Sequence, residues 1–182
     1  TDIKLGLEAL QKDPRARRLT KDIRRLDDRV AGTIASLRTE LLFLEDLQLA
    51  MKDFISGINL ILLRRYQMAK RPVEIRISNE TREQGLNIES KALLSNEVKI
   101  ELCMILQELC NNNLKYGTRA PVWTITVDSE RLEIRLKGRS RTKQKQFGRG
   151  HETLRRRADT ISAFFSETTS AGGYSAVIGI RF

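Results

Sequence analysis

The sequence has few cysteines, few aromatic residues and no long apolar run. Its 182 residues include two cysteines, and aromatic residues make up only 5% of the chain. No apolar run approaches the roughly 20 residues that span a bilayer, and no signal peptide is visible. Cys103 and Cys110 stand seven residues apart in one predicted helix. About 10 Å of rise separates them, which excludes a disulfide between them. Reduced thiols predict a cytoplasmic protein.

What is present indicates a globular protein of one large domain or two small ones. Hydrophobic residues make up 40% of the chain and charged residues 31%, and the length is enough to bury a core. The chain begins at Thr1 rather than at a methionine, so we expect it to be a piece of a longer protein. A membrane-bound sensor portion upstream of Thr1 is one alternative that the sequence leaves open.

The net charge of +10 raises the question of an anionic partner. Between Lys137 and Arg157 nine residues are Lys or Arg, and only Glu152 is acidic. Such basicity suggests nucleic acid or another anionic surface. The scarcity of aromatic residues and the lack of a helix-turn-helix, zinc-ligand or stacking motif argue against nucleic acid as the main partner. Binding of an anion or of nucleic acid through residues 137–157 therefore stays the minor alternative, and we expect no nucleic acid.

The region before Pro72 reads as helix. Apolar residues recur at steps of three and four from Leu19 to Met68, which is the period of a helix face. Fifty residues exceed one typical globular helix, so we predict a helical hairpin over 1–71 with its bend near Glu45 to Leu49. One continuous helix is the alternative. Two helices alone leave an apolar stripe exposed, and pairing with a second copy into a four-helix bundle would cover it. We expect a homodimer; packing of the stripe against the rest of the chain is the alternative.

The region after Pro72, residues 72–182, alternates between helix and strand patterns. A helix, a hairpin, a basic glycine-bearing loop, a helix and a second hairpin predict a mixed sheet with helices on one face, an α+β fold. The predicted elements are a strand in VEIRI (73–77), a helix from Ser95 or Asn96 to Gly117, strands in VWTITVD and RLEIRLK around Asp128–Glu130, a helix in HETLRRRADTIS, and strands in FFSETT and YSAVIGIRF joined by SAGG.

Three segments of this second region resemble motifs of the sensor histidine kinases of two-component systems, in the order in which that family has them. ILQELCNNNLKYG resembles the N box, E-L-x-N-N-x-x-K-H/Y. GRGHETLRRRAD resembles the second glycine box, G-x-G-L-x-N-x-x-x-R-A, and GGYSAVIGI resembles the final G-T-x-V-x-V strand. The resemblance covers roughly residues 86–182. It implies the ATP-binding α/β sandwich that histidine kinases share with gyrase-type ATPases and heat-shock chaperones.

The same resemblance gives the helical region a role. In this family the first helix of the hairpin carries L-H-D-x-V-x-x-x-L-x-x-L, and the sequence from Leu26 matches that register with Val30, Ile34 and Leu37. Asp27 stands where the phosphoacceptor histidine is expected. The only histidine of the chain, His151, lies in the second glycine box at a position that the family fills with leucine. The family's reaction forms a phosphoramidate on an imidazole nitrogen, so this chain is not expected to phosphorylate itself in that way. A merely polar helix start is the alternative interpretation of Asp27.

The N box implies candidate nucleotide-binding residues. Glu108 matches the glutamate that orients the reacting groups, and Asn112 matches the asparagine that holds Mg²⁺, one helical turn away. Lys115 and Tyr116 match the residues that approach phosphate and ribose. The alternative is an ordinary solvated helix face, although the Asn-Asn-Asn run is poor helix material and favours a retained site or its remnant.

The glycine boxes match less well. Gly148 and Gly150 match glycines that let backbone amides approach phosphates, although they are also ordinary loop residues before a helix. The first glycine box, D-x-G-x-G, should follow RLEIRLK, and its aspartate accepts a hydrogen bond from the adenine amino group. Lys137, Gly138, Arg139 and Ser140 stand there instead. Lysine has only donors, so we expect Lys137 to oppose adenine.

These departures from two motifs predict a degenerate, or pseudo, histidine kinase. Such a module would dimerise, transmit a helix rearrangement, and bind a partner kinase or a response regulator. The main alternative is an active ATP-dependent kinase that uses Glu108 and Asn112 to phosphorylate a histidine of a partner. We predict no obligatory cofactor, and ATP with Mg²⁺ at Asn112 is what the alternative would require.

Overall fold

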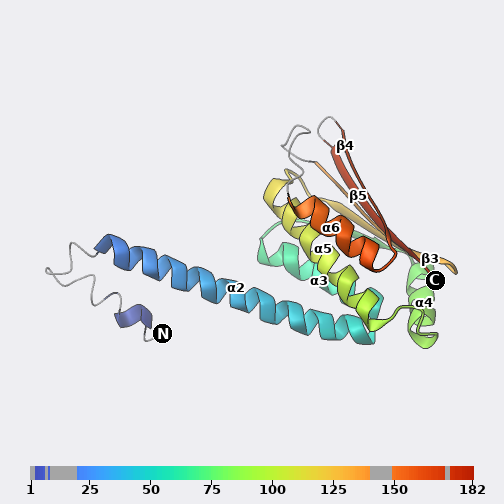
Figure 1. The fold of residues 1–182 in the computed structure, drawn as a ribbon, viewed down its shortest axis with the longest axis horizontal. Coiled ribbons are helices and arrows are strands. Elements are labelled where there is room, and N and C mark those ends of the chain that lie inside the picture. Colours follow the sequence, from blue (N-terminus) through green and yellow to red (C-terminus); the bar gives the residue numbers. More distant parts are fainter. Residues whose placement is uncertain (1–2, 7, 9–19, 140–148, 171–172) are drawn as a thin grey trace. The chain divides into compact units, whose positions relative to one another are not determined.

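A computed structural model describes residues 3–6, 8, 20–139, 149–170 and 173–182 of the chain (Figure 1). The chain divides into two compact units, Thr1–Leu44 and Glu45–Phe182, and each is described by itself. The helices and strands from α2 onward are α2 (Thr20–Lys52), α3 (Phe54–Met68), β1 (Glu74–Ile77), α4 (Asn79–Ser90), α5 (Asn96–Tyr116), β2 (Val122–Val127), β3 (Arg131–Gly138), α6 (Arg149–Thr160), β4 (Phe164–Ser170) and β5 (Gly173–Arg181).

The first unit contains most of helix α2, and this helix carries the apolar stripe that the sequence predicts. The large apolar side chains of the stripe are between 46% and 61% exposed. Thr33 and Thr39 on the same helix donate their hydroxyls to the carbonyls of Arg29 and Ala35, one turn back, at 2.9 Å. The helix therefore presents an exposed apolar face, formed by Leu26, Ile34, Leu37, Leu41 and Leu44.

The bend between α2 and α3 lies at Asp53, so the predicted bend at Glu45 to Leu49 is wrong by several residues. Asp53 has extended backbone angles (φ −141°, ψ 99°), and its carboxylate accepts a hydrogen bond from the N–H of Ser56 at 3.0 Å. It is the N-cap of α3. After the bend the two helices cross so closely that a Cβ on Gly57 would lie 2.3 Å from Cα of Ala50. In the sequence, this bend is marked by Asp53, a good N-cap residue, and by Gly57 four residues later.

A partly buried ion pair joins this bend to the rest of the second unit. Lys99 of α5 is only 5% exposed, and its ammonium lies 2.6 Å from Oε2 of Glu89. Oε1 of Glu89 accepts a hydrogen bond from the N–H of Phe54, the first residue of α3, at 3.0 Å. One carboxylate thus joins the end of α4, the start of α3 and the start of α5.

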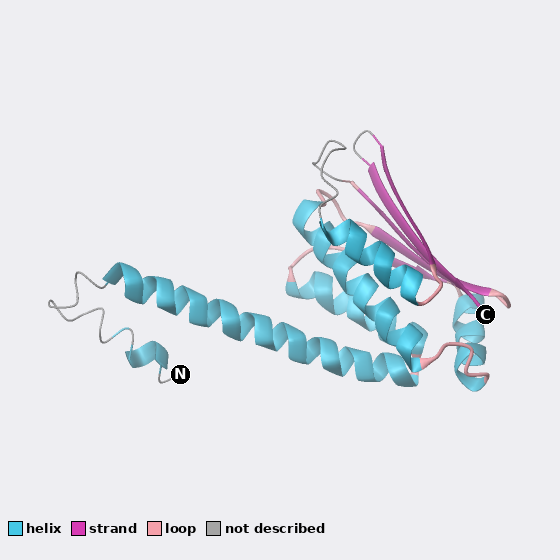
Figure 2. Cartoon of the chain, in the orientation of Figure 1, coloured by secondary structure: helices cyan, strands magenta, loops and turns pink. Residues whose placement is uncertain are grey.

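The sheet has five strands in the order β1-β2-β3-β5-β4. Strand β1 is parallel to β2, and the other neighbours are antiparallel. Helices α3, α5 and α6 lie on one face of the sheet, as Figures 1 and 2 show. The predicted α+β class, the mixed sheet and the helical layer on one face are therefore confirmed.

The core lies between the sheet and this helical layer. Apolar residues of the strands alternate with polar ones, so that one face of each strand is buried. Helix α4 was not predicted, because its buried face is only a few residues wide; Ser78 caps it by accepting from the N–H of Thr81 at 3.0 Å. The largest fully buried side chains are those of Trp123, Tyr66, Phe54, Ile58, Ile61, Leu62, Ile88, Leu102, Ile105, Leu106, Leu109 and Ile125.

Candidate functional site

The candidate nucleotide-binding residues of the N box lie on the last turns of α5. Glu108, Asn112 and Lys115 follow one another at helical spacing and form one stripe beside the buried face. Glu108 and Asn112 are half-buried, whereas Lys115 and Tyr116 are exposed. The ammonium of Lys115 lies 5.1 Å from the ring centre of Tyr116, within cation–π distance. The structure thus brings the predicted N-box residues together at one end of one helix.

The N-terminus of α6 lies near this end of α5. The two helices pack together, and an ion pair of 2.6 Å joins Arg157 of α6 to Glu101 of α5. Figure 1 shows the two helices running in opposite directions. Seven residues before Arg157, about 10 Å along the axis, the chain reaches Gly150 in the first turn of α6, beside the turn of α5 that carries Glu108. Gly148 and the basic loop 140–148 lie outside the described residues.

A guanidinium closes the end of α5. Arg71 donates to the carbonyls of Leu114 and Gly117, both at 3.0 Å, which satisfies groups that a helix C-terminus leaves unpaired. Gly117 ends the helix as predicted, but with extended backbone angles (φ −71°, ψ 145°). Glycine is needed there for space: a Cβ would lie 2.5 Å from the carbonyl oxygen of Asn113.

Beside this helix end lies a buried polar network that the sequence pattern does not predict. Asn113 is 4% exposed, and its Oδ1 accepts a hydrogen bond from the hydroxyl of Tyr66 at 3.0 Å. The same hydroxyl accepts from the indole N–H of Trp123 at 3.3 Å. Burial raises the pKa of Tyr66 well above its ordinary value, and the neighbouring Cys110 raises it further. The phenol therefore stays neutral and acts as donor and acceptor at once.

The end of β3 corrects the role expected of Lys137. Residues of β3 alternate between the two faces, with Leu132, Ile134 and Leu136 buried under the helices and Lys137 exposed. Lys137 therefore points to the face of the sheet away from α5. The residue at the strand end on the helical face is Gly138, and a Cβ there would lie 2.9 Å from Nδ2 of Asn113. The strand alternation in the sequence already contained this information.

The only histidine of the chain is tied into the C-terminal hairpin. Nδ1 of His151 on α6 pairs with Oε2 of Glu167 on β4. The Glu167 side chain is only 4% exposed, and its Oε1 accepts a hydrogen bond from the hydroxyl of Tyr174 on β5 at 2.5 Å. Burial, and then the carboxylate of Glu167, raises the pKa of Tyr174 far above its ordinary value. His151 thus joins the first turn of α6 to the last two strands through a polar contact. The leucine expected at this position of the second glycine box could make only apolar contacts.

The structure also places Asp27 and the two cysteines. Asp27 is half-buried on α2 in the first unit. Cys103 and Cys110 are free thiols, as predicted. Both are also buried, and burial raises the pKa of each thiol to about 12. Within the described ranges, no cluster of three or more His, Cys, Asp or Glu could hold a metal ion. No helix among them is long and apolar enough to cross a membrane.

Comparison with solved structures identifies the fold. No protein-family model and no curated protein matches the sequence. The histidine kinase domain of the blue-light activated histidine kinase EL346 of Erythrobacter litoralis matches with a TM-score of 0.58 and 15% identity, covering 98% of this chain and 92% of that one. The histidine kinase AdeS of Acinetobacter baumannii matches with a TM-score of 0.53 and 14% identity, covering 98% and 94%. The chain therefore has the fold of the histidine kinase domains.

Proposed function

We propose that this chain is a degenerate histidine kinase that works as a dimeric signalling and partner-binding module in a two-component-type pathway. On this proposal residues 1–71 are the dimerisation and phosphoacceptor-like region, and residues 72–182 are the kinase-like ATPase region. The module would be cytoplasmic, and its partner would be an active kinase or a response regulator.

One observation carries the proposal. The chain has the fold of a histidine kinase domain and a single imidazole, and that imidazole is His151, on α6 rather than on α2. Its Nδ1 is engaged with the buried carboxylate of Glu167. Asp27, on α2, has a carboxylate where the phosphoramidate chemistry requires a ring nitrogen. The residues of α2 therefore supply no acceptor for that reaction.

The end of β3 fits the adenine of ATP poorly. Adenine offers its amino group as a donor, and a matching site needs an acceptor on the helical face of the sheet. Gly138 has no side chain, and Nδ2 of Asn113 lies 2.9 Å from the point where a Cβ would stand. Because Oδ1 of Asn113 already accepts from Tyr66, the amide group left beside Gly138 is the donor, Nδ2. Two donors would face each other, which costs about 1–3 kcal/mol for neutral groups.

The N-box end of α5 favours the rival proposal, an active kinase acting on a partner. Glu108 and Asn112 lie one turn apart and half-buried, so a carboxylate and an amide oxygen remain where the family holds Mg²⁺ and orients the reacting groups. Glu108, Asn112, Lys115 and Gly150 would then contact Mg²⁺ and phosphates. The rival needs ATP to bind despite Gly138, which separates the two proposals experimentally.

The experiment is an autophosphorylation assay with Mg-ATP labelled at the γ-phosphate. The wild type should form no acid-labile, base-stable phosphate, and Asp27→His alone should form none either, because the adenine contact at Gly138 is still missing. Addition of an acceptor protein containing a phosphorylatable histidine tests the rival. Labelling of residues 1–72 in the wild type would refute the proposal, and labelling of the added acceptor alone would establish the rival.

A further inference from the structure

One edge of the sheet is open in the part of the chain that the structure describes. Strand β4 is the last strand in the order β1-β2-β3-β5-β4, so only β5 pairs with it. The register of the two strands runs without interruption from Phe164 opposite Gly179 to Ser170 opposite Gly173. Strand β4 therefore has an unbroken edge of seven residues with no bulge. We call its unpaired side the β4 edge.

The direction of the backbone groups on this edge follows from one hydrogen bond. The N–H of Phe182 bonds to the carbonyl of Glu130 at 2.9 Å. Hydrogen-bonded pairs alternate along an antiparallel ladder, so the odd-numbered residues of β5 direct their N–H and C=O groups toward β4. In the register of the two strands, these groups satisfy the even-numbered residues of β4. The residues left with N–H and C=O groups on the β4 edge are Phe165, Glu167 and Thr169.

The two edge strands of the sheet differ in their protection. Natural edge strands are usually guarded against further pairing by charge, proline or short length. Strand β1 has only four residues, and two of them, Glu74 and Arg76, form an exposed ion pair of 2.7 Å. Strand β4, FFSETTS, contains no lysine, arginine or proline. Its one charged side chain, Glu167, is only 4% exposed and is engaged by His151 and Tyr174. The β4 edge therefore lacks the devices that block strand addition.

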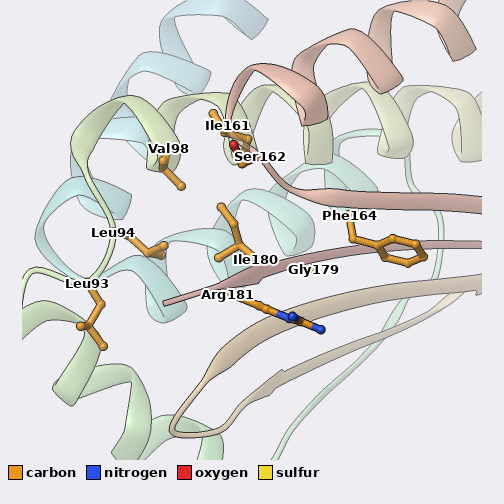
Figure 3. Close-up of a pocket in the computed structure, with 9 residues that line it drawn as sticks. All are labelled: Leu93, Leu94, Val98, Ile161, Ser162, Phe164, Gly179, Ile180 and Arg181. Carbon is orange, nitrogen blue, oxygen red and sulfur yellow. The ribbon is translucent and has the colours of Figure 1, made fainter.

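Two aromatic side chains stand at the start of this edge, one on each face of the sheet. Phe164 is 65% exposed, and it pairs with Gly179, which has no side chain to cover it. Figure 3 shows its ring on the side away from Ile161 and Ile180. Phe165 lies on the helical face and is half-buried. A strand added at the β4 edge would cover both rings, so the edge favours apolar residues of a partner at this end.

A second copy of β4 suits this edge poorly. If two copies paired in antiparallel orientation through all three residues of the edge, Glu167 would lie directly opposite the same residue of the other chain. Both carboxylates would be on the helical face, where that of Glu167 is 4% exposed. Like charges directly opposite one another destabilise a strand pair. A segment with no charge at this position avoids the repulsion, so the edge favours a different chain.

We propose that the β4 edge binds an extended, uncharged segment of a partner protein as a sixth, antiparallel strand of the sheet. Three N–H and three C=O groups of β4 would bond to the segment, which is the means by which strand addition gains affinity. β-branched residues along the segment, with apolar residues opposite Phe164 and Phe165, would give specificity. This surface uses neither the N-box residues nor α2, so the proposal goes beyond the function proposed above and does not depend on it.

Two isomeric peptides test the backbone hydrogen bonds. Both have the sequence TVTTVIY with blocked ends, which places isoleucine and tyrosine opposite Phe165 and Phe164 in the antiparallel register. One is N-methylated at its third and fifth residues, whose N–H groups would point away from β4. The other is N-methylated at its fourth and sixth residues, whose N–H groups would face β4.

The first peptide should bind saturably at millimolar concentration, with one peptide per chain. In NMR spectra it should shift the amides of β4 and slow the hydrogen exchange of Phe165, Glu167 and Thr169. The second peptide should bind at least tenfold more weakly. Equal affinity of the two peptides, no saturable binding of the first, or shifts confined to other elements would overturn the proposal.

Variants test the surface itself. Phe164→Ser should weaken binding of the first peptide at least fivefold, whereas Leu86→Ser, which removes a side chain of α4 that is 67% exposed, should leave it within twofold. Thr169→Pro removes one N–H of the edge and none of the β4–β5 ladder, and should weaken binding at least tenfold. If Phe164→Ser and Leu86→Ser behave alike, the β4 edge is not the binding site. Self-association that Leu37→Asp retains and Thr169→Pro abolishes would assign the edge to a second copy and overturn the proposal.

Discussion

At the scale of single residues, the most consequential contact is between Asn113 and Gly138. Gly138→Ala should lower the free energy of unfolding by about 1–3 kcal/mol, because the new Cβ would lie 2.9 Å from the Asn113 amide, in a packed interior. Chemical denaturation measures this. In an Asn113→Ala background the same change should cost far less, although Asn113→Ala itself removes the hydrogen bond to Tyr66.

Gly32→Ala is the matched control for this pair. Gly32 lies inside α2 with nothing within 4 Å of a Cβ, so alanine there should stabilise the helix by up to about 1 kcal/mol. An equal cost of Gly138→Ala in both backgrounds would show that the two side chains do not compete for space.

The buried thiols predict how stability depends on pH. The pKa of both Cys103 and Cys110 is raised to about 12, above that of an unfolded thiol, about 8.5. Because the pKa of each thiol is higher in the folded protein, the protonated thiols stabilise the folded state fully below the pKa of the unfolded state. This stabilisation is lost as the pH rises toward the pKa of the folded state. The free energy of unfolding should therefore fall between about pH 8.5 and 12. The double variant Cys103→Ala/Cys110→Ala should show a shallower fall, and an unchanged slope would contradict the assignment.

At the scale of elements, the bend at Asp53 depends on the pair of Glu89 and Lys99. Glu89→Ala should destabilise the protein by up to about 3–5 kcal/mol, because it leaves the ammonium of Lys99, 5% exposed, with only the carbonyl of Met51 at 3.5 Å. Glu89→Leu/Lys99→Met, which removes both charges, should recover much of that loss. The exposed pair of Glu74 and Arg76 is the control: Glu74→Gln should change stability by less than about 1 kcal/mol. A double variant no more stable than Glu89→Ala would show that the unpaired charge of Lys99 is not the main cause of the destabilisation.

Some helices and strands could be predicted from local sequence patterns, whereas other features depend on residues distant in the sequence. Periodicity and capping residues predicted α5, α6 and the strands of both hairpins, because each has a strong local pattern. The position of the bend was missed because it depends on Asp53, Gly57 and a contact with Glu89, which is distant in sequence. At the site, the N-box stripe was predicted from the resemblance of ILQELCNNNLKYG to the N box of the histidine kinases. Asn113 and Glu167 were missed because their roles depend on Tyr66 and His151, which only the fold brings beside them.

At the scale of the whole molecule, the exposed stripe of α2 predicts a homodimer. Ile34 and Leu37 are 46% and 53% exposed, and a second copy would cover them in a four-helix bundle. Light scattering at tens of micromolar should give twice the mass of the chain. Leu37→Asp should give a monomer, since a buried unpaired carboxylate is strongly unfavourable. Arg38→Asp, one residue away in sequence, controls for charge alone. A monomer mass for the wild type would refute the assembly.

We propose that this kinase-like fold does not recognise adenine. Thermal unfolding in the presence of matched ligands tests this proposal. A ligand that binds only the folded state stabilises it by RT ln(1 + [L]/Kd), or about 2.7 kcal/mol at a hundredfold excess over Kd. A competent ATP site would therefore raise the melting temperature by several degrees for a chain of this size. We predict that 1 mM Mg-ATP and 1 mM inorganic triphosphate give the same shift of about a degree or less, abolished by salt. A shift of several degrees with Mg-ATP that triphosphate does not reproduce would refute the proposed pseudokinase and establish adenine recognition.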